Sequence, residues 1–136
     1  MRNARHVGMR VLFAALVLVF AAGTARAQDA VKVAPNNFKV LLENDRVRVL
    51  DYHAKPGDKI PMHSHPAYII YAVSGTGKSK FTSADGKTEE REATAGGATW
   101  RDAETHAAEY LGPGDVHAVL VELKGKAHKM AHMKKM

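Results

Sequence analysis

After residue 30 the sequence consists of short apolar segments separated by turn-forming residues. Runs rich in Val, Ile, Tyr, Phe and Thr predict strands, because β-branched and aromatic side chains suit a pleated, half-buried surface. Turn segments such as Lys55-Pro56-Gly57-Asp58 and Gly112-Pro113-Gly114-Asp115 recur at roughly the 8 to 12 residue spacing of a sandwich or barrel. No segment in this region has convincing helical periodicity. The strands predicted from these runs are 38–42, 46–54, 67–73, 77–82, 98–102, 105–111 and 116–123.

The first 27 residues have a different pattern, which is typical of an export signal. A basic start is followed by the uninterrupted apolar run Val11 to Ala22 and then by Ala25-Arg26-Ala27. This order predicts a cleavable signal peptide over residues 1–27 and a mature chain that begins at Gln28. The apolar run is shorter than the ~18 to 20 residues of a membrane-spanning helix, so we expect no stable membrane anchor after cleavage. The expected location is the periplasm or the extracellular space.

Removal of that segment changes the charge of the chain. Of 20 Lys and Arg residues, four arginines lie before residue 28, which leaves 16 bases against 14 acids. Five of the remaining bases are lysines of the tail 124–136, so residues 28–123 carry 11 bases and 14 acids. A weakly acidic body excludes the basic surface of a nucleic-acid-binding protein. Cysteine is absent, which excludes disulfides and thiolate metal sites and leaves histidine, carboxylate and methionine as metal ligands.

Two histidines are the first candidate for chemistry. In a strand the side chains of His63 and His65 point to the same face, with Cβ atoms roughly 7 Å apart, so both imidazoles can bind one ion. Pro61 and Pro66 flank the pair, and proline is confined to strand ends and sheet edges. An isolated pair of this kind is also found as two tolerated polar residues on a half-exposed strand.

The spacing around this pair resembles the first motif of the cupin family, G-x5-H-x-H-x3,4-E-x6-G. Gly57 precedes His63 by the motif's spacing, and Gly75 or Gly77 closes the segment. The second cupin motif is recognisable between Gly97 and His106. The two blocks and the strands around them cover residues 38–123, and the resemblance implies one all-β domain, a double-stranded β-helix of the cupin or jelly-roll type. Residues 28–37 are expected to be an N-terminal lead-in and 124–136 a basic tail containing His and Met.

The sequence also departs from the cupin motifs. The motif glutamate position falls on Ile69 or Ile70, and Tyr110 stands at the last position of the second motif, where only the histidine is retained. Carried over to this sequence, the resemblance implies three metal ligands, His63, His65 and His106, as in three-histidine members such as acetylacetone dioxygenase. Three neutral imidazoles suit a divalent transition metal, Zn²⁺, Fe²⁺, Cu²⁺ or Ni²⁺, rather than Mg²⁺ or Ca²⁺.

The residues around the predicted metal form the expected substrate pocket. Strand alternation places Tyr110 on the face of His106 and Glu109 on the opposite face, so no carboxylate is expected to point inward. His117 is expected to be a wall residue, a group beside the ligands or a fourth ligand. The predicted pocket residues are Ile69, Tyr71, Tyr110 and His117.

Two functions from different classes follow from this site. The first is a metal-dependent enzyme, a dioxygenase or an isomerase-like cupin, that acts on a small organic molecule with Tyr71 or Tyr110 near the substrate. The second is a non-catalytic module that binds a small molecule or a metal. The resemblance also implies a homodimer.

Overall fold

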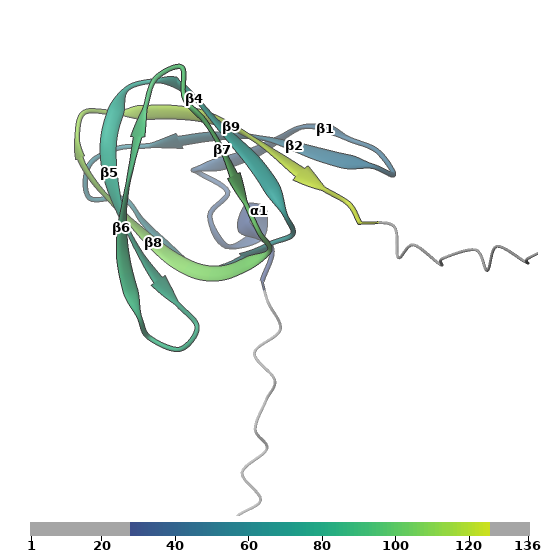
Figure 1. Ribbon diagram of the computed structural model, residues 1–136, viewed down its shortest axis with the longest axis horizontal. Helices are drawn as coiled ribbons and strands as arrows, with labels where there is room; N and C mark the ends of the chain where they lie inside the picture. Colours follow the sequence, from purple (N-terminus) through teal and green to yellow (C-terminus); the bar gives the residue numbers. More distant parts are fainter. Residues whose placement is uncertain (1–27, 126–136) are drawn as a thin grey trace, which may run out of the picture.

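The computed structural model describes residues 28–125, and these form two antiparallel sheets that face each other. The predicted signal peptide and nearly all of the predicted tail lie outside the described residues. Figure 1 shows the strands as a ring around a central space. No helix within residues 28–125 is long and apolar enough to cross a membrane.

The first sheet contains five strands in the order β1-β2-β9-β4-β7, and the second contains four in the order β3-β8-β5-β6. Neighbours in the sheets are often distant in sequence, since β2 pairs with β9 and β3 with β8. The nine strands are β1 (Phe38–Glu43), β2 (Val47–Ala54), β3 (Lys59–His65), β4 (Tyr68–Ser74), β5 (Thr76–Ser83), β6 (Thr88–Thr94), β7 (Ala98–Arg101), β8 (Glu104–Pro113) and β9 (Val116–Leu123).

All seven predicted strands are present, with ends that differ by a few residues, and two further strands complete the barrel. Strand β3 carries the His63/His65 pair, which was expected in a strand although its surroundings lack an apolar run. Strand β6 is mostly polar and lies at the edge of its sheet, so it buries too little apolar surface to give a strand pattern.

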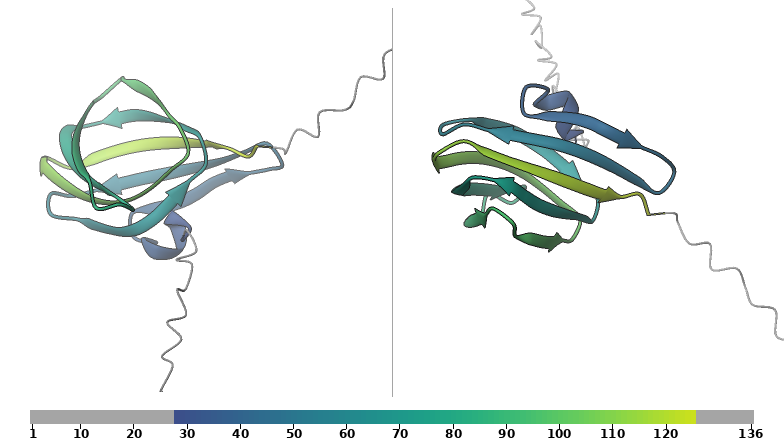
Figure 2. Two further views of the ribbon diagram at one scale, coloured as in Figure 1. Left: turned by 60° about the horizontal axis from the view of Figure 1, so that its bottom comes forward. Right: turned by 90° about the horizontal axis from the view of Figure 1, so that it is seen from above.

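The segment before β1 is more ordered than the predicted lead-in. Residues Ala30–Val33 form the one-turn helix α1, which is too short to show helical periodicity. Asp29 caps this helix by accepting a hydrogen bond from the Val31 amide at 2.9 Å. Ala30 and Ala34 are buried in the main apolar cluster with Phe38 and Leu50. Helix α1 therefore packs against one end of the barrel beside β3 and β1, as the two views in Figure 2 show.

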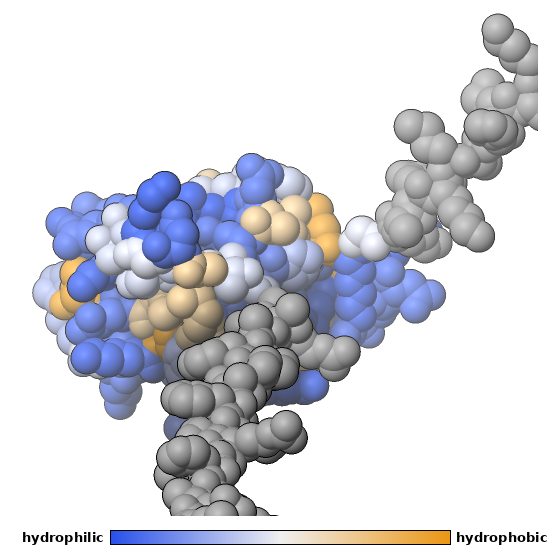
Figure 3. Space-filling model, turned by 90° about the horizontal axis from the view of Figure 1, so that it is seen from below, coloured by the Kyte–Doolittle hydropathy of each residue, from blue (hydrophilic) through white to orange (hydrophobic). Residues whose placement is uncertain are grey.

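Strand β9 illustrates how the barrel separates its interior from its outer face. Its burial alternates with a period of two, so Val116, Ala118, Leu120 and Glu122 point inward. The β1–β2 hairpin extends beyond the ring, as Figure 1 shows, and Leu41 at 59% is among its exposed residues. On the face seen in Figure 3, apolar residues form separate patches among hydrophilic ones.

Candidate metal site

The pairing of β3 with β8 brings the three predicted metal ligands together. His63 lies directly opposite His106 in this register, and His65 lies two residues further along β3 on the same face. All three side chains point into the barrel, and the whole residues are 1% (His63), 4% (His65) and 4% (His106) exposed. The sequence alone could place the first two on one face, but the third joins them only through this long-range strand pairing.

The three imidazoles form a compact group. Ring centroids of His63 and His65 are 4.8 Å apart, as are those of His63 and His106, and both pairs are close to perpendicular. One potential ligand atom from each residue lies within 4.8 Å of the other two. Two nitrogens bound to one zinc ion at about 2.0–2.1 Å lie at most about 4.2 Å apart, so metal binding would draw these atoms together through side-chain rotation.

Hydrogen bonds orient two of the three rings. The Nδ1 atom of His63 lies 2.8 Å from the carbonyl oxygen of Pro61, and Nδ1 of His65 lies 2.6 Å from Glu122 Oε1. Both partners accept hydrogen bonds, so each Nδ1 carries the proton and each Nε2 keeps a free lone pair. A metal-binding histidine usually has this arrangement, with its second nitrogen bonded to a carbonyl or carboxylate.

The protonation state of His63 also suits a metal. Burial lowers the pKa of His63 to about 4, and the neighbouring imidazoles of His65 and His106 add to this effect. His63 is therefore neutral near pH 7, as a metal ligand must be. In addition, Nδ1 of His106 is buried and has no hydrogen-bond partner within the described part of the chain. A neutral imidazole at His63 and an unsatisfied buried nitrogen at His106 fit a site for a divalent transition metal.

A buried carboxylate supports this site from β9. Glu122 is 1% exposed, and its second oxygen accepts a hydrogen bond from Nε of Arg48 at 2.6 Å. Arg48 in turn donates to Asp29 Oδ2 at 2.5 Å, which links the site to the cap of α1. Burial alone would raise the pKa of Glu122, but the bonds from His65 and Arg48 outweigh burial and lower it. This series of hydrogen bonds, from Asp29 through Arg48, therefore holds the charged carboxylate of Glu122 against the candidate ligand His65.

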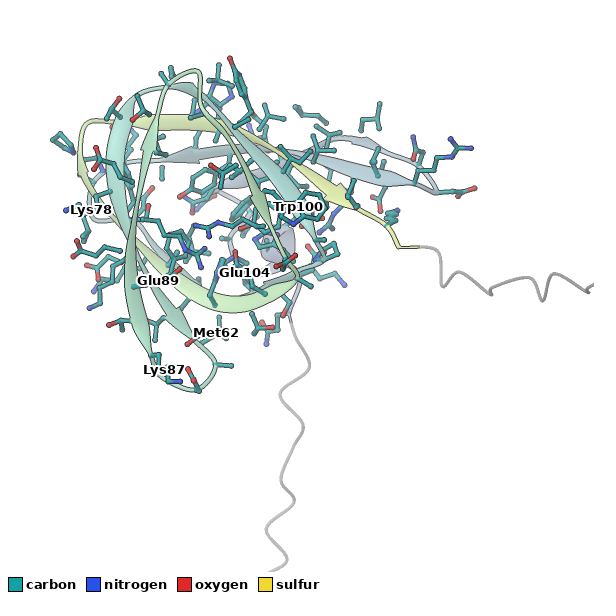
Figure 4. All side chains as sticks on the ribbon, in the orientation of Figure 1. Met62, Lys78, Lys87, Glu89, Trp100 and Glu104 are labelled. Atoms are coloured by element: carbon teal, nitrogen blue, oxygen red, sulfur yellow. The ribbon has the colours of Figure 1, made fainter. Side chains whose placement is uncertain are left out.

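A second carboxylate lies on the other side of the cluster. Glu104 accepts bonds from the Tyr68 hydroxyl at 2.6 Å and from Arg91 at 2.8 and 3.1 Å, and its Oε2 is 3.4 Å from His106 Nδ1. Burial would raise the pKa of Glu104, but His106, Arg91 and Tyr68 together hold it well below its usual range. Figure 4 shows Glu104 within the ring of strands, whereas Lys78 and Lys87 lie outside it.

These two carboxylates correct the expectation that no acid points inward. Glu122 is in phase with the inward residues Ala118 and Leu120, not with His117 and Val119. Both faces of β9 carry apolar residues, so the alternation of side chains alone could not show which face points into the barrel. No local pattern indicated Glu122 or Glu104, because their partners, Arg48 and Arg91, are brought close only by the fold.

A cavity of about 190 Å³ opens onto His65 and His106. Its walls are largely apolar and include Phe38, Ile70 and Leu120. Two arginines also line the cavity, and they differ in their partners. Arg91 lies over the Phe81 ring at 4.3 Å and pairs with Glu104, whereas Arg101 has no ion-pair partner among the residues described.

The structure separates the four predicted pocket residues. Tyr110 lines the cavity, and its hydroxyl donates to the carbonyl of Gly114 at 2.5 Å. Ile69 and Tyr71 are 39% and 46% exposed, because Tyr68, Ile70 and Ala72 are the inward residues of β4. His117 also lies outside the cavity, where it bonds to Asp51 at 2.6 Å. The pocket prediction is therefore wrong in its geometry for Ile69, Tyr71 and His117.

Comparison with solved structures shows the same fold. A cupin domain from Bordetella pertussis is 20% identical with a TM-score of 0.58, and the match covers 74% of this chain and 98% of that one. A protein with a double-stranded β-helix domain from Klebsiella pneumoniae is 23% identical with a TM-score of 0.52, covering 76% and 93%. An RmlC-like cupin family protein from Methanocaldococcus jannaschii is 12% identical with a TM-score of 0.52, covering 63% and 77%.

No protein-family model and no curated protein matches the sequence. The structural matches show the fold, which is the double-stranded β-helix of cupins. They carry no conclusion about activity, which has to be argued from the residues of the site.

Proposed function

We propose that this protein binds a divalent transition metal through His63, His65 and His106 and acts on a small organic acid held in the barrel. The observation that carries the proposal is the buried cluster of three imidazoles, two of them oriented through Nδ1 by Pro61 and Glu122. Bound there, zinc, iron, copper or nickel would supply a Lewis acid, and iron or copper would also supply redox chemistry with dioxygen.

The cavity supports a small substrate that combines an apolar body with an acidic group. A space of about 190 Å³ with apolar walls suits a compact molecule. Arg101 is in register with the inward residue Tyr68, so its guanidinium lies on the cavity side of β7. A cation that has no ion-pair partner within residues 28–125 is available for a carboxylate, with which arginine forms strong charge-assisted bonds. The side chain of Arg101 would thus orient the substrate, and the apolar wall would exclude water.

Metal analysis of the full chain tests the proposal. Protein purified without chelators and reconstituted with each of the four metals in turn is assayed for bound metal per chain. We expect His63→Ala and His106→Ala each to bind one equivalent of metal per chain less than the wild type. Because both remove the same site, the double variant should bind no less metal than either single variant. In a His53→Ala background, which removes an exposed imidazole, His63→Ala must again lose one equivalent. If no equivalent depends on both His63 and His106, the proposal fails.

Dioxygen uptake separates the enzyme from the non-catalytic module. The iron- and copper-loaded proteins are tested with a diketone, acetylacetone, and with a catechol bearing a carboxylate. Uptake that is lost in His106→Ala supports an oxygenase. The alternative is a module that binds a small molecule without turnover, and it is supported by one observation: both inward glutamates already accept hydrogen bonds from arginines. Metal binding without reaction would favour this alternative.

The proposed setting is outside the cytoplasm. The support is the signal-like sequence of residues 1–27. If the protein in the exported fraction has the intact mass of a chain that starts at Gln28, cleavage after Ala27 is supported. The mass of a chain that starts at Met1 would contradict it. We also propose a homodimer, as the cupin resemblance implies, and light scattering of the purified mature chain tests it.

A further inference from the structure

A second group of metal-ligating side chains lies on the outer face of the five-stranded sheet. Asp51 and His53 are two residues apart on β2, so their side chains share the face opposite to that of the buried Leu50. His117 on β9 is directly opposite His53 in the strand register. The three side chains therefore meet outside the barrel, on the opposite face of the sheet from the interior cluster.

The geometry of this group is specific. Asp51 Oδ1 lies 2.6 Å from His117 Nε2, and Asp51 Oδ2 lies 3.1 Å from His53 Nε2. The two rings are stacked, with centroids 4.1 Å apart and planes 8° from parallel. Each imidazole thus directs its Nε2 atom at the Asp51 carboxylate. One potential ligand atom of each of the three residues lies within 4.8 Å of the other two.

We propose that Asp51, His53 and His117 form a second, surface metal site that takes a divalent ion of the zinc or copper class. Two imidazoles and one carboxylate are a donor set that both ions accept. To bind the ion, each ring would present the lone pair of Nε2 and carry its proton on Nδ1, so a neutral ring changes tautomer and a protonated ring releases one proton to solvent. Bonds of about 2.0–2.1 Å require the two rings to rotate from their parallel stack toward a common point, and side chains with solvent on one side can do so.

The surroundings favour an ion at this position. Exposed fractions of 20% for Asp51, 58% for His53 and 29% for His117 allow an ion to enter without opening the fold. Burial opposes ionisation of Asp51, but His117 and His53 together outweigh it and lower its pKa, so the carboxylate is charged near pH 7. Lys39 is the residue of β1 in register with Asp51, yet it makes no ion pair with this carboxylate. Asp51 thus remains available to the imidazoles and to an ion.

The charge of this site differs from that of the interior cluster. The carboxylate offsets half of the ion's charge, whereas three neutral imidazoles offset none. Three protein donors leave at least one position of a tetrahedral ion for water or an external ligand, as in zinc sites that are not closed. The second site also shares no residue with the first, so each can fail independently.

Zinc and copper titrations of the full chain in a His63→Ala/His106→Ala background test the proposal. This background removes the interior ligands and leaves the outer face unchanged. We expect one equivalent of Zn²⁺ to remain, with its affinity lowered at least tenfold by Asp51→Asn and by His53→Ala, and its binding abolished by His117→Ala. Asp45→Asn, in the exposed turn between β1 and β2, is the matched carboxylate control and should leave binding unchanged.

A spectroscopic readout identifies the ligands directly. In the same background, Cu²⁺ should give an electron paramagnetic resonance spectrum with coupling to two imidazole nitrogens, and His53→Ala should reduce this to one. His53 is mostly exposed, so its removal leaves the core intact and keeps the test valid if His117→Ala does not fold. Zinc binding that depends on His128 and His132 instead of this group, or no binding in the background, overturns the proposal. Neither result tests metal binding by the interior histidines.

Discussion

The carboxylate of Glu122 receives a hydrogen bond from Nδ1 of His65 at 2.6 Å, in a position where both side chains are 2% exposed. The bond occupies Nδ1 and leaves Nε2 as the nitrogen of His65 that can bind a metal. Arg48 keeps Glu122 charged from the other side. A negative group behind a ligand raises the basicity of that ligand, so Glu122 has a defined task in the proposed metal site.

We therefore expect Glu122→Gln to weaken zinc binding at the interior site by about 10 to 100-fold, the usual effect of removing such a partner. The amide keeps the volume of the side chain but loses its charge. Loss of the buried charge also leaves Arg48 with Asp29 alone, and we expect a stability cost of about 1–3 kcal/mol. Competition with a chromophoric chelator measures the affinity, and urea unfolding measures the stability.

Glu109→Gln is the control for this substitution. Glu109 lies on β8 near His106 in sequence but faces outward, 4.0 Å from Lys59, so its removal should leave zinc affinity unchanged. If Glu122→Gln lowers stability and leaves zinc affinity within twofold of the wild type, then Glu122 has a structural role only.

Local pattern was enough to predict the fold class and most strands, because β-branched runs and turn residues follow each other at regular spacing. It was also enough to place His63 and His65 on one face. The phase of β9 could not be predicted, since Val119 and Val121 on one face are as apolar as Ala118 and Leu120 on the other. The side that faces inward is decided by packing against other strands.

The partners of the site were hidden for a similar reason. Glu122 lies 74 residues from Arg48 and 57 from His65 along the chain, and no local motif links them. The position of His106 opposite His63 was expected only from the cupin resemblance, and the β3–β8 register confirms that the two are brought together. Motif spacing thus predicted the candidate ligands, whereas the residues that orient them required the structure.

The guanidinium of Arg101 on the cavity wall leads to a prediction about ligand charge. We expect Arg101→Gln in the zinc-loaded protein to weaken binding of benzoate by about 10 to 100-fold, which corresponds to the loss of one charge-assisted hydrogen bond of about 1.5–3 kcal/mol. Benzamide has nearly the same size and apolar body but no charge, so its affinity should not change. Calorimetric titration measures both ligands.

Arg46→Gln serves as the control because Arg46 is exposed in the turn between β1 and β2, away from the cavity. It should leave benzoate binding unchanged. Equal losses for benzoate and benzamide in Arg101→Gln, or no benzoate binding in the wild type, would contradict an anion-binding role for Arg101.

Gly77 and Tyr110 are in close contact where β5 pairs with β8. A Cβ atom at residue 77 would lie 2.1 Å from the Tyr110 hydroxyl oxygen and 2.8 Å from the Gly112 carbonyl. We expect Gly77→Ala to displace Tyr110 and to destabilise the domain by about 1–3 kcal/mol, the usual cost of overpacking. Thermal unfolding measures this cost. At Gly114 a Cβ would have no atom within 4 Å, so Gly114→Ala should change stability much less. Similar effects of the two substitutions would contradict this explanation.

The cap of α1 gives a prediction with a pH dependence. Asp29 accepts bonds from the Val31 amide and from Arg48, and asparagine can keep the first but not the charge of the second. Because Asp29 is 29% exposed, we expect Asp29→Asn to cost only about 0.2–1 kcal/mol near pH 7. Asp29→Ala also loses the cap and should cost about 1 kcal/mol more.

The sign of the pH effect follows from the pKa of Asp29. Burial would raise this pKa, but the bonds from Arg48 and the amides of Val31 and Lys32 outweigh burial and lower it from 3.8. A carboxyl group whose pKa is lowered in the folded state stabilises the protein above its unfolded value and loses that contribution as pH falls through the folded value. The stability difference between the wild type and Asp29→Asn should therefore be full at pH 7 and shrink below about pH 4. Urea unfolding of both proteins at pH 7, 5 and 3.5 measures it, with Asp45→Asn as the exposed control. A difference that stays constant or grows toward acid pH would show that the ion pair with Arg48 does not stabilise the helix cap.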